Sequence, residues 1–124
     1  MRIIGIDPGL CKIGFSIIDF NVRNIYYISS GTILLPKYYS IYKKLRLIFN
    51  NIDRIISNVQ PNISTLEIVF SGFNKYSNLM LCHSRGVILL ALIKKNLIIF
   101  EYTALQIKKI ITGNGKSKKK RFKS

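Results

Sequence analysis

Two carboxylates stand where a divalent cation could bind. Asp7 ends a β-branched N-terminal segment and is followed directly by the turn dipeptide Pro8-Gly9. Glu67 lies inside a second apolar segment, where period-two alternation would place a core residue and an unpaired carboxylate would be costly. If the two segments are neighbouring strands, both carboxylates meet at one end of a sheet. Because Mg²⁺ prefers oxygen ligands on a rigid frame, Asp7 and Glu67 are candidate metal ligands.

The surroundings of Asp7 leave space for a substrate. Gly9 and Gly14 carry no side chain, so a phosphate-sized group could approach the backbone there. A turn of this kind also occurs without any ligand, so the hypothesis depends on Glu67 lying beside Asp7. A Mg²⁺ ion held by both carboxylates could also hold a substrate phosphate.

The charge balance favours a nucleic-acid partner. The 124 residues include 20 Lys and Arg but five Asp and Glu, which gives a net charge of +15. A codon bias toward Lys would account for part of this excess. Neither Cys11 nor Cys82 has metal-ligand spacing, and the apolar run at 87–93 is shorter than the ~20 residues that span a bilayer. We therefore expect a cytoplasmic, single-domain protein with reduced thiols.

The elements that must position these carboxylates can be predicted from hydrophobic periodicity. Three β-rich runs joined by short connections favour an antiparallel meander, and apolar residues then recur every three or four positions, as in an amphipathic helix. The order βββαβαβα predicts an α/β fold, with a mixed five-stranded sheet flanked by helices. The expected strands are 1–7, 12–20, 24–35, 63–70 and 97–102, and the expected helices are 41–59, 74–95 and 104–111. We expect residues 1–112 to form one domain and 113–124 to be a basic tail.

Four stretches of the chain, in order, resemble the RuvC-type Holliday-junction resolvases. The resemblance covers nearly the whole sequence, and the four motifs together are specific. The resemblance implies a ribonuclease-H-like fold and a cytoplasmic homodimer that resolves four-way DNA junctions with Mg²⁺ in recombination and repair. It also implies branch-migration helicase partners. The stretches are Gly5-Ile6-Asp7-Pro8-Gly9 with Gly14-Phe15; Leu66-Glu67-Ile68-Val69-Phe70 with Asn74 and Ser84-Arg85-Gly86-Val87; Phe100-Glu101-Tyr102 through Gln106-Ile107-Lys108; and Gly113-Asn114-Gly115 with Lys119.

The resemblance also implies roles for individual residues. Asp7 and Glu67 match the catalytic, metal-binding acids of the family. Phe70 matches an aromatic wedge that could stack on bases near the branch point, although the same residue taken alone could be a core aromatic. Lys108 and Lys119 match basic positions that would contact phosphate or stabilise developing charge. The tail offers further phosphate contacts or is a solvated end, since 108–124 holds eight Lys and Arg and no acid.

One departure from the family pattern limits the expected activity. The family continues into helices that supply two further acids, whereas this sequence has no carboxylate after Glu101. Two-metal hydrolysis needs ions about 3.5–4 Å apart, so we expect Asp7 and Glu67 to hold one Mg²⁺ and a shortened chain to be impaired. Glu101 could substitute for a missing ligand, but a pair with a lysine such as Lys108 is the preferred interpretation. A non-catalytic, basic nucleic-acid-binding protein of the same fold is the alternative.

Overall fold

A mixed five-stranded sheet lies at the centre of the protein. The structure is a computed structural model that describes residues 1–69 and 74–112. The strand order is β3-β2-β1-β4-β5; the first three strands are antiparallel, and β4 and β5 run parallel to β1. The strands are β1 (Arg2–Asp7), β2 (Lys12–Phe20), β3 (Ile25–Leu34), β4 (Ile63–Ile68) and β5 (Ile98–Thr103). The predicted meander and mixed sheet are confirmed.

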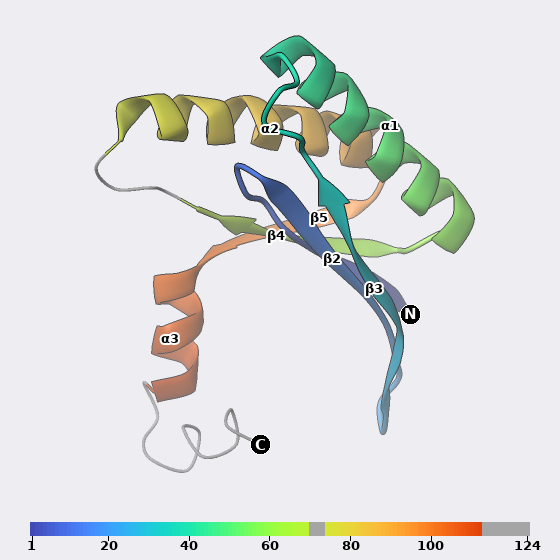
Figure 1. The fold of residues 1–124 in the computed structure, drawn as a ribbon. Coiled ribbons are helices and arrows are strands. Elements are labelled where there is room, and N and C mark those ends of the chain that lie inside the picture. The colour runs from blue at the N-terminus through green and yellow to red at the C-terminus, as the bar shows by residue number, and fades with distance from the viewer. Residues whose placement is uncertain (70–73, 113–124) are drawn as a thin grey trace.

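Two long helices cover one face of the sheet and pack on each other (Figure 1). The first, α1 (Ile41–Val59), begins at Ser40, whose hydroxyl accepts a hydrogen bond from the Lys43 amide. The second, α2 (Lys75–Lys94), begins in the same way at Asn74. A short helix, α3 (Ala104–Thr112), follows β5 and projects away from the side that α1 and α2 cover. All three helices begin and end within a residue of the sequence-based ranges.

Alternation along the strands separates a core face from an open face. Ile4 and Ile6 of β1 and Leu66 of β4 are fully buried beneath the helices. Length and composition alone would allow α2 to cross a membrane. Its residues Ile88 and Leu92 are buried in the core that α2 forms with the sheet and α1. The side chains between the buried positions of β1 and β4 therefore lie on the face opposite the two long helices.

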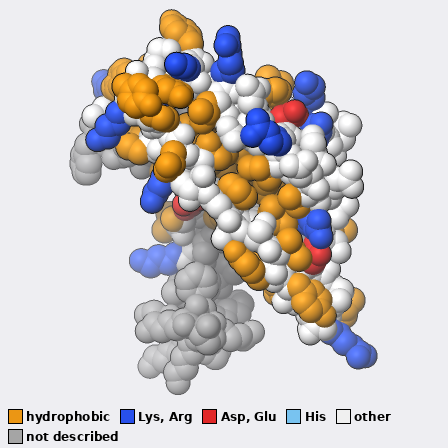
Figure 2. Space-filling model, turned by 45° about the vertical axis from the view of Figure 1, so that its right-hand side comes forward, with side chains coloured by type: hydrophobic (Ala, Val, Ile, Leu, Met, Phe, Trp, Pro, Cys, Tyr) orange, Lys and Arg blue, Asp and Glu red, His pale blue; other side chains and the backbone are white. Residues whose placement is uncertain are grey.

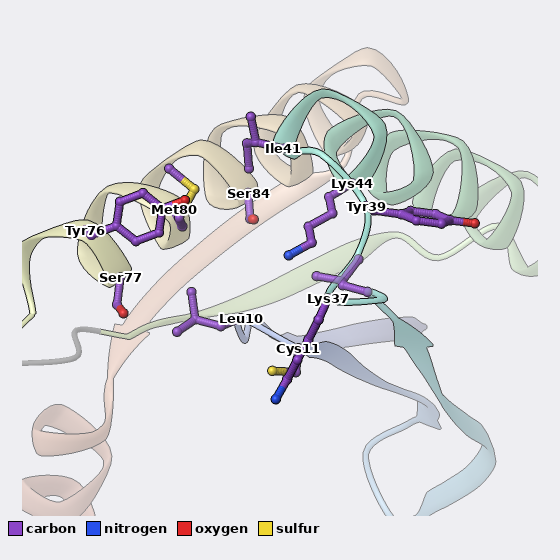
Figure 3. A pocket seen from close by; sticks show the side chains of 11 residues that line it. Leu10, Cys11, Lys37, Tyr39, Ile41, Lys44, Tyr76, Ser77, Met80 and Ser84 are labelled. Atoms are coloured by element: carbon purple, nitrogen blue, oxygen red, sulfur yellow. The ribbon is translucent and has the colours of Figure 1, made fainter.

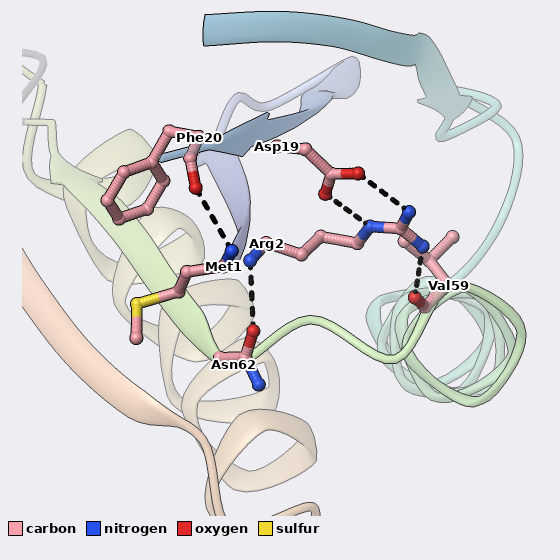
Figure 4. Close-up of polar contacts among 6 residues, drawn as sticks. All are labelled: Met1, Arg2, Asp19, Phe20, Val59 and Asn62. Carbon is pink, nitrogen blue, oxygen red and sulfur yellow. Dashed lines mark hydrogen bonds and ion pairs between the residues drawn. The ribbon is translucent and has the colours of Figure 1, made fainter. Parts of the chain in front are cut away.

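Arg2 joins four segments at the end of the sheet remote from Asp7 (Figure 4). Its Nε and Nη2 donate to both carboxylate oxygens of Asp19 at 2.7 and 3.0 Å, and its Nη1 donates to the carbonyl of Val59 at 2.7 Å. Its backbone amide donates to the side chain of Asn62 at 2.9 Å. Arg2 therefore holds β1 against the end of β2, the end of α1 and the connection into β4.

Candidate metal and nucleic-acid site

The five carboxylates fall into two groups. Asp19 pairs with Arg2, Asp53 with Lys95, and Glu101 with Arg85. The remaining two, Asp7 and Glu67, contact each other. A carboxylate next to a second carboxylate is a high-energy arrangement unless a proton or a cation lies between them. The arrangement of Asp7 and Glu67 therefore differs from a structural ion pair.

Strand register brings Asp7 and Glu67 together. Ile6 of β1 is the partner of Leu66 in the parallel β4, so the next residue of each strand is aligned as well. The two strands end here, which places both carboxylates at one edge of the sheet, as predicted. One detail of the sequence interpretation was wrong, because Glu67 does not take a core position. Ser64 and Leu66 fill the core face of β4, and Glu67 lies half-buried on the open face.

The proximity of the two acids changes the protonation of Glu67. A hydrogen bond with the Asp7 carboxyl group raises the pKa of Glu67, and partial burial and the negative charge of Asp7 raise that pKa further. All three causes oppose a second negative charge at this edge of the sheet. In the absence of a cation the pair therefore retains a proton more strongly than an isolated glutamate does.

Tyr102 is a further member of the site that the sequence reasoning did not assign. It is the register partner of Glu67 on β5, so the two side chains share the open face. Burial raises the pKa of Tyr102, and the charges of Glu67 and Asp7 raise it further. The phenol therefore stays protonated and is a hydrogen-bond donor beside the two carboxylates. The sequence signal that could have identified Tyr102 is its position in β5, one residue after Glu101 and therefore on the opposite face of the strand.

An open cleft of about 590 Å³ adjoins Asp7, with Gly9, Cys11, Gly14 and Thr32 among its lining residues. The two glycines have different roles. A side chain on Gly9 would come within 2.4 Å of the Lys12 carbonyl oxygen, so the tight turn itself requires this glycine. A Cβ on Gly14 would meet no heavy atom closer than the Asp7 Cβ at 3.9 Å. Gly14 thus leaves the space beside Asp7 that the sequence predicts, whereas Gly9 serves the turn.

Glu101 does not lie with the acidic pair. It is the register partner of Leu66, on the core face of the sheet, where it pairs with Arg85 of α2. The sequence interpretation expected an ion pair for Glu101, which is confirmed, but proposed a lysine such as Lys108. Arg85 is the observed partner because α2 packs on the face to which Glu101 points. Glu101 therefore belongs to the contact between α2 and β5.

The other predicted site residues are only partly described. Lys108 lies on α3 and is exposed. Phe70, Lys119 and the predicted tail at 113–124 lie outside the described residues.

Within residues 1–69 and 74–112, no group of three or more His, Cys, Asp and Glu side chains gathers in a way that could hold a metal ion. The two carboxylate groups of Asp7 and Glu67, at the neighbouring ends of β1 and β4, fit one hard cation, with water or phosphate completing its ligands.

The surface outside the site is basic. Figure 2 shows Lys and Arg side chains spread over the face in view, with few acidic side chains among them. A field of this sign attracts polyanions and raises their local concentration. The two acids at the edge of β1 and β4 thus lie within a positively charged surface.

Comparison with known proteins identifies the family. Residues 3–124 match the profile of the family described as "Crossover junction endodeoxyribonuclease RuvC". A protein of that description from Bordetella avium is 43% identical over 119 residues, which are 96% of this chain and 66% of the relative. A second, from Bordetella petrii, is 41% identical, and the match covers 65% of it. The chain therefore spans slightly less than two thirds of these curated relatives.

Solved structures share the fold. The RuvC of T. thermophilus, in complex with a Holliday junction substrate, superposes with a TM-score of 0.79 at 15% identity, over 90% of this chain and 70% of that one. The yeast mitochondrial Holliday junction resolvase Ydc2 gives a TM-score of 0.57 at 9% identity, over 82% of this chain and 52% of that one. These likenesses confirm the expected ribonuclease-H-like fold. With its sequence matched from residue 3 to residue 124, the chain belongs to the RuvC family.

Proposed function

We propose that this chain is the nuclease part of a structure-selective DNA endonuclease that resolves Holliday junctions, with Asp7 and Glu67 as its catalytic acids. The observation that carries the proposal is the contact between these two carboxylates, because the other three carboxylates of the chain pair with cationic side chains. Their shared position at the exposed end of two parallel strands gives a substrate access to both. Membership of the RuvC family supports the same reaction.

The acidic pair fits a Mg²⁺ ion. Asp7 and Glu67 would hold it, and its charge would replace the proton that the pair otherwise retains. Bound Mg²⁺ would polarise a phosphodiester and stabilise the charge that develops on one of the two reacting oxygens. Tyr102 would donate a hydrogen bond to a carboxylate or to a phosphate oxygen beside the pair. The space at Gly14 would admit that phosphate.

Contacts with DNA would extend beyond the acidic pair. In the proposal Lys108, which is exposed in the middle of α3, and Lys119 contact backbone phosphates, and Phe70 stacks on bases near the branch point. The basic residues of 113–124 would add phosphate contacts, so affinity would depend strongly on salt. A cytoplasmic location and association with a branch-migration helicase complete the functional proposal on grounds of family membership.

We also propose that two copies associate through α2. One face of the helix carries an exposed apolar stripe, whose residues are spaced three to seven apart. The stripe consists of Leu79, Gly86, Leu90 and Ile93. A Cβ on Gly86 would meet no heavy atom within 4 Å, so this glycine allows a second helix to approach closely. A second copy suits such a stripe because a two-fold contact brings the same apolar patch onto itself.

Junction binding is the experiment that tests the function. We expect the protein to bind a four-way DNA junction more tightly than a duplex of equal length, with an affinity that falls steeply as salt rises. Equal affinity for junction and duplex would contradict the resolvase function and favour the alternative, a non-catalytic nucleic-acid-binding protein.

Phe70→Ala should reduce junction distortion or cleavage far more than it reduces thermal stability. A large fall in melting temperature for Phe70→Ala with unchanged junction binding would make Phe70 a core residue.

A further inference from the structure

A second cavity, of about 270 Å³, lies beside the cleft at Asp7. It is enclosed by the turn between β1 and β2, the connection from β3 to α1, and the first turns of α1 and α2 (Figure 3). Leu10 and Cys11 line both spaces, so the cavity and the cleft are neighbours that meet at these two residues. An extended ligand that passes the acidic pair could therefore continue into the second cavity.

The chemistry of this cavity differs from that of the acidic pair. Two lysines, Lys37 and Lys44, line it, and its lining contains no Asp or Glu. In Figure 3 Lys44 reaches from α1 into the space between α1, α2 and the β1–β2 turn. Ammonium groups without an adjacent carboxylate favour an anion. We call this space the lysine pocket; its polar lining residues are Lys37, Lys44, Tyr76, Ser77 and Ser84.

Two further features of the lysine pocket favour phosphate joined to a nucleoside. Ser84 is 6% exposed, and its side chain points into the space that Lys44 enters (Figure 3), so its hydroxyl is a candidate hydrogen-bond donor to a ligand. The ring of Tyr76 is 68% exposed at the edge of the pocket and offers an aromatic face to a base or a sugar. Lysine, hydroxyl and aromatic groups together match a nucleotide unit of a DNA strand better than they match an inorganic ion.

We propose that the lysine pocket binds a backbone phosphate of the DNA strand whose scissile phosphodiester lies at Asp7 and Glu67. The position of the scissile bond rests on the proposed function, whereas binding of a DNA strand in the pocket does not. Lys37 and Lys44 neutralise the phosphate, Ser77 and Ser84 donate hydrogen bonds to it, and Tyr76 contacts the adjoining nucleoside. The pocket thereby fixes the register of the strand relative to the acidic pair.

Cys11 is a built-in probe of this site. It is exposed and lines the pocket, whereas Cys82, also exposed, lies on α2 outside the lining. The alkylation rates of both thiols can be measured by mass spectrometry, with and without an oligothymidylate of about eight nucleotides. At ten times the Kd we expect alkylation of Cys11 to slow about tenfold and alkylation of Cys82 to stay unchanged. Both samples have the same protein concentration, so self-association affects them equally.

Matched variants show whether the lysines are responsible. Lys37→Gln/Lys44→Gln should lose the protection of Cys11 at the same oligonucleotide concentration. Arg54→Gln removes a charge from an exposed position of α1, outside the pocket lining, and should keep the protection. Melting curves show that each variant is folded, and the single change at the exposed Lys37 replaces the double variant if that variant does not fold. Inorganic phosphate in place of DNA should protect Cys11 only weakly, because it lacks the nucleoside.

The outcomes separate this inference from the proposed function. Oligonucleotide binding without protection of Cys11, or equal protection in Lys37→Gln/Lys44→Gln, would overturn the lysine pocket as a DNA site. Absence of any oligonucleotide binding would overturn it as well. Full protection by inorganic phosphate alone would make the pocket a small-anion site. Protection by oligothymidylate without any preference for junctions over duplex would support the pocket while contradicting the resolvase function.

Discussion

The carboxyl groups of Asp7 and Glu67 lie close together where β1 and β4 end side by side, and their proximity raises the pKa of Glu67. Such a contact requires that at least one carboxyl be protonated or that a cation replace the proton. The fold therefore retains an arrangement that is unfavourable for the metal-free protein at neutral pH. An arrangement of this kind is typical of a binding site rather than of a structural contact.

The pH dependence of stability should reveal this strain. Because the folded pKa of Glu67 is raised, its contribution to stability is complete below its ordinary value of 4.5 and is lost as the pH rises through the raised pKa. Glu67→Gln removes that loss, so the metal-free variant should be at least as stable as the wild type at neutral pH. Urea unfolding in a chelator, between about pH 4 and pH 8, measures the difference.

Glu101→Gln is the matched control for that measurement. It removes a carboxylate that pairs with Arg85, so it should destabilise the protein at neutral pH. If Glu67→Gln instead destabilised the metal-free protein by about 3–5 kcal/mol, Glu67 would hold a buried cationic partner and the metal site would be wrong.

Magnesium should stabilise the folded protein only modestly. With two carboxylates as ligands we expect about 1 kcal/mol or less at a few times the Kd, because the ion binds the folded state in preference to the unfolded one. Asp7→Asn or Glu67→Gln should abolish this gain, and Asp53→Asn should leave it intact. Thermal unfolding at increasing Mg²⁺ concentration measures the effect. Equal stabilisation of all three variants would show that the ion binds elsewhere.

The acid limb of the stability profile should depend on Arg2. The hydrogen bonds and the charge of Arg2 hold the pKa of Asp19 below its usual value, so the stability from this pair is present at neutral pH and is lost as the pH falls through the lowered pKa. Arg2→Met should lower the melting temperature at pH 7, and its difference from the wild type should shrink in acid. Arg23→Met, at an exposed turn, should change neither. A difference that stayed constant in acid would mean that packing dominates.

Local patterns in the sequence were sufficient for the elements but not for their contacts. The apolar stripe of 41–59 predicted α1, and the turn after Asp7 predicted the end of β1, because both signals lie within one segment. The pair Glu101–Arg85 was missed because it depends on which face of β5 lies under α2. The lysine pocket has no sequence signal at all, since its walls come from segments that meet only in the folded chain.

Association through α2 should be sensitive to single charges. Leu90→Lys places an ammonium group in the apolar stripe, so the assembly should dissociate at concentrations where the wild type remains associated. Ser57→Lys adds the same charge to an exposed position of α1 and should have no effect. Sedimentation equilibrium distinguishes the two states. A wild type that remains monomeric at all concentrations would remove α2 as an interface.

Cleavage should require acidic groups beyond Asp7 and Glu67. Two carboxylates can neutralise one Mg²⁺, whereas stabilisation of both the attacking and the leaving oxygen is best achieved by two ions about 3.5–4 Å apart. We therefore expect this chain to nick a four-way junction slowly in Mg²⁺. Fusion of a C-terminal segment that carries two further acidic residues, as the family resemblance implies, should raise the rate by orders of magnitude. Single-turnover assays on a labelled junction measure both rates. The same fusion with Asp7→Asn must lose the gain, because the added acids then lack their partner on β1. If the chain alone cleaved as fast as the fusion, two carboxylates would be sufficient and the requirement for a second ion would be wrong.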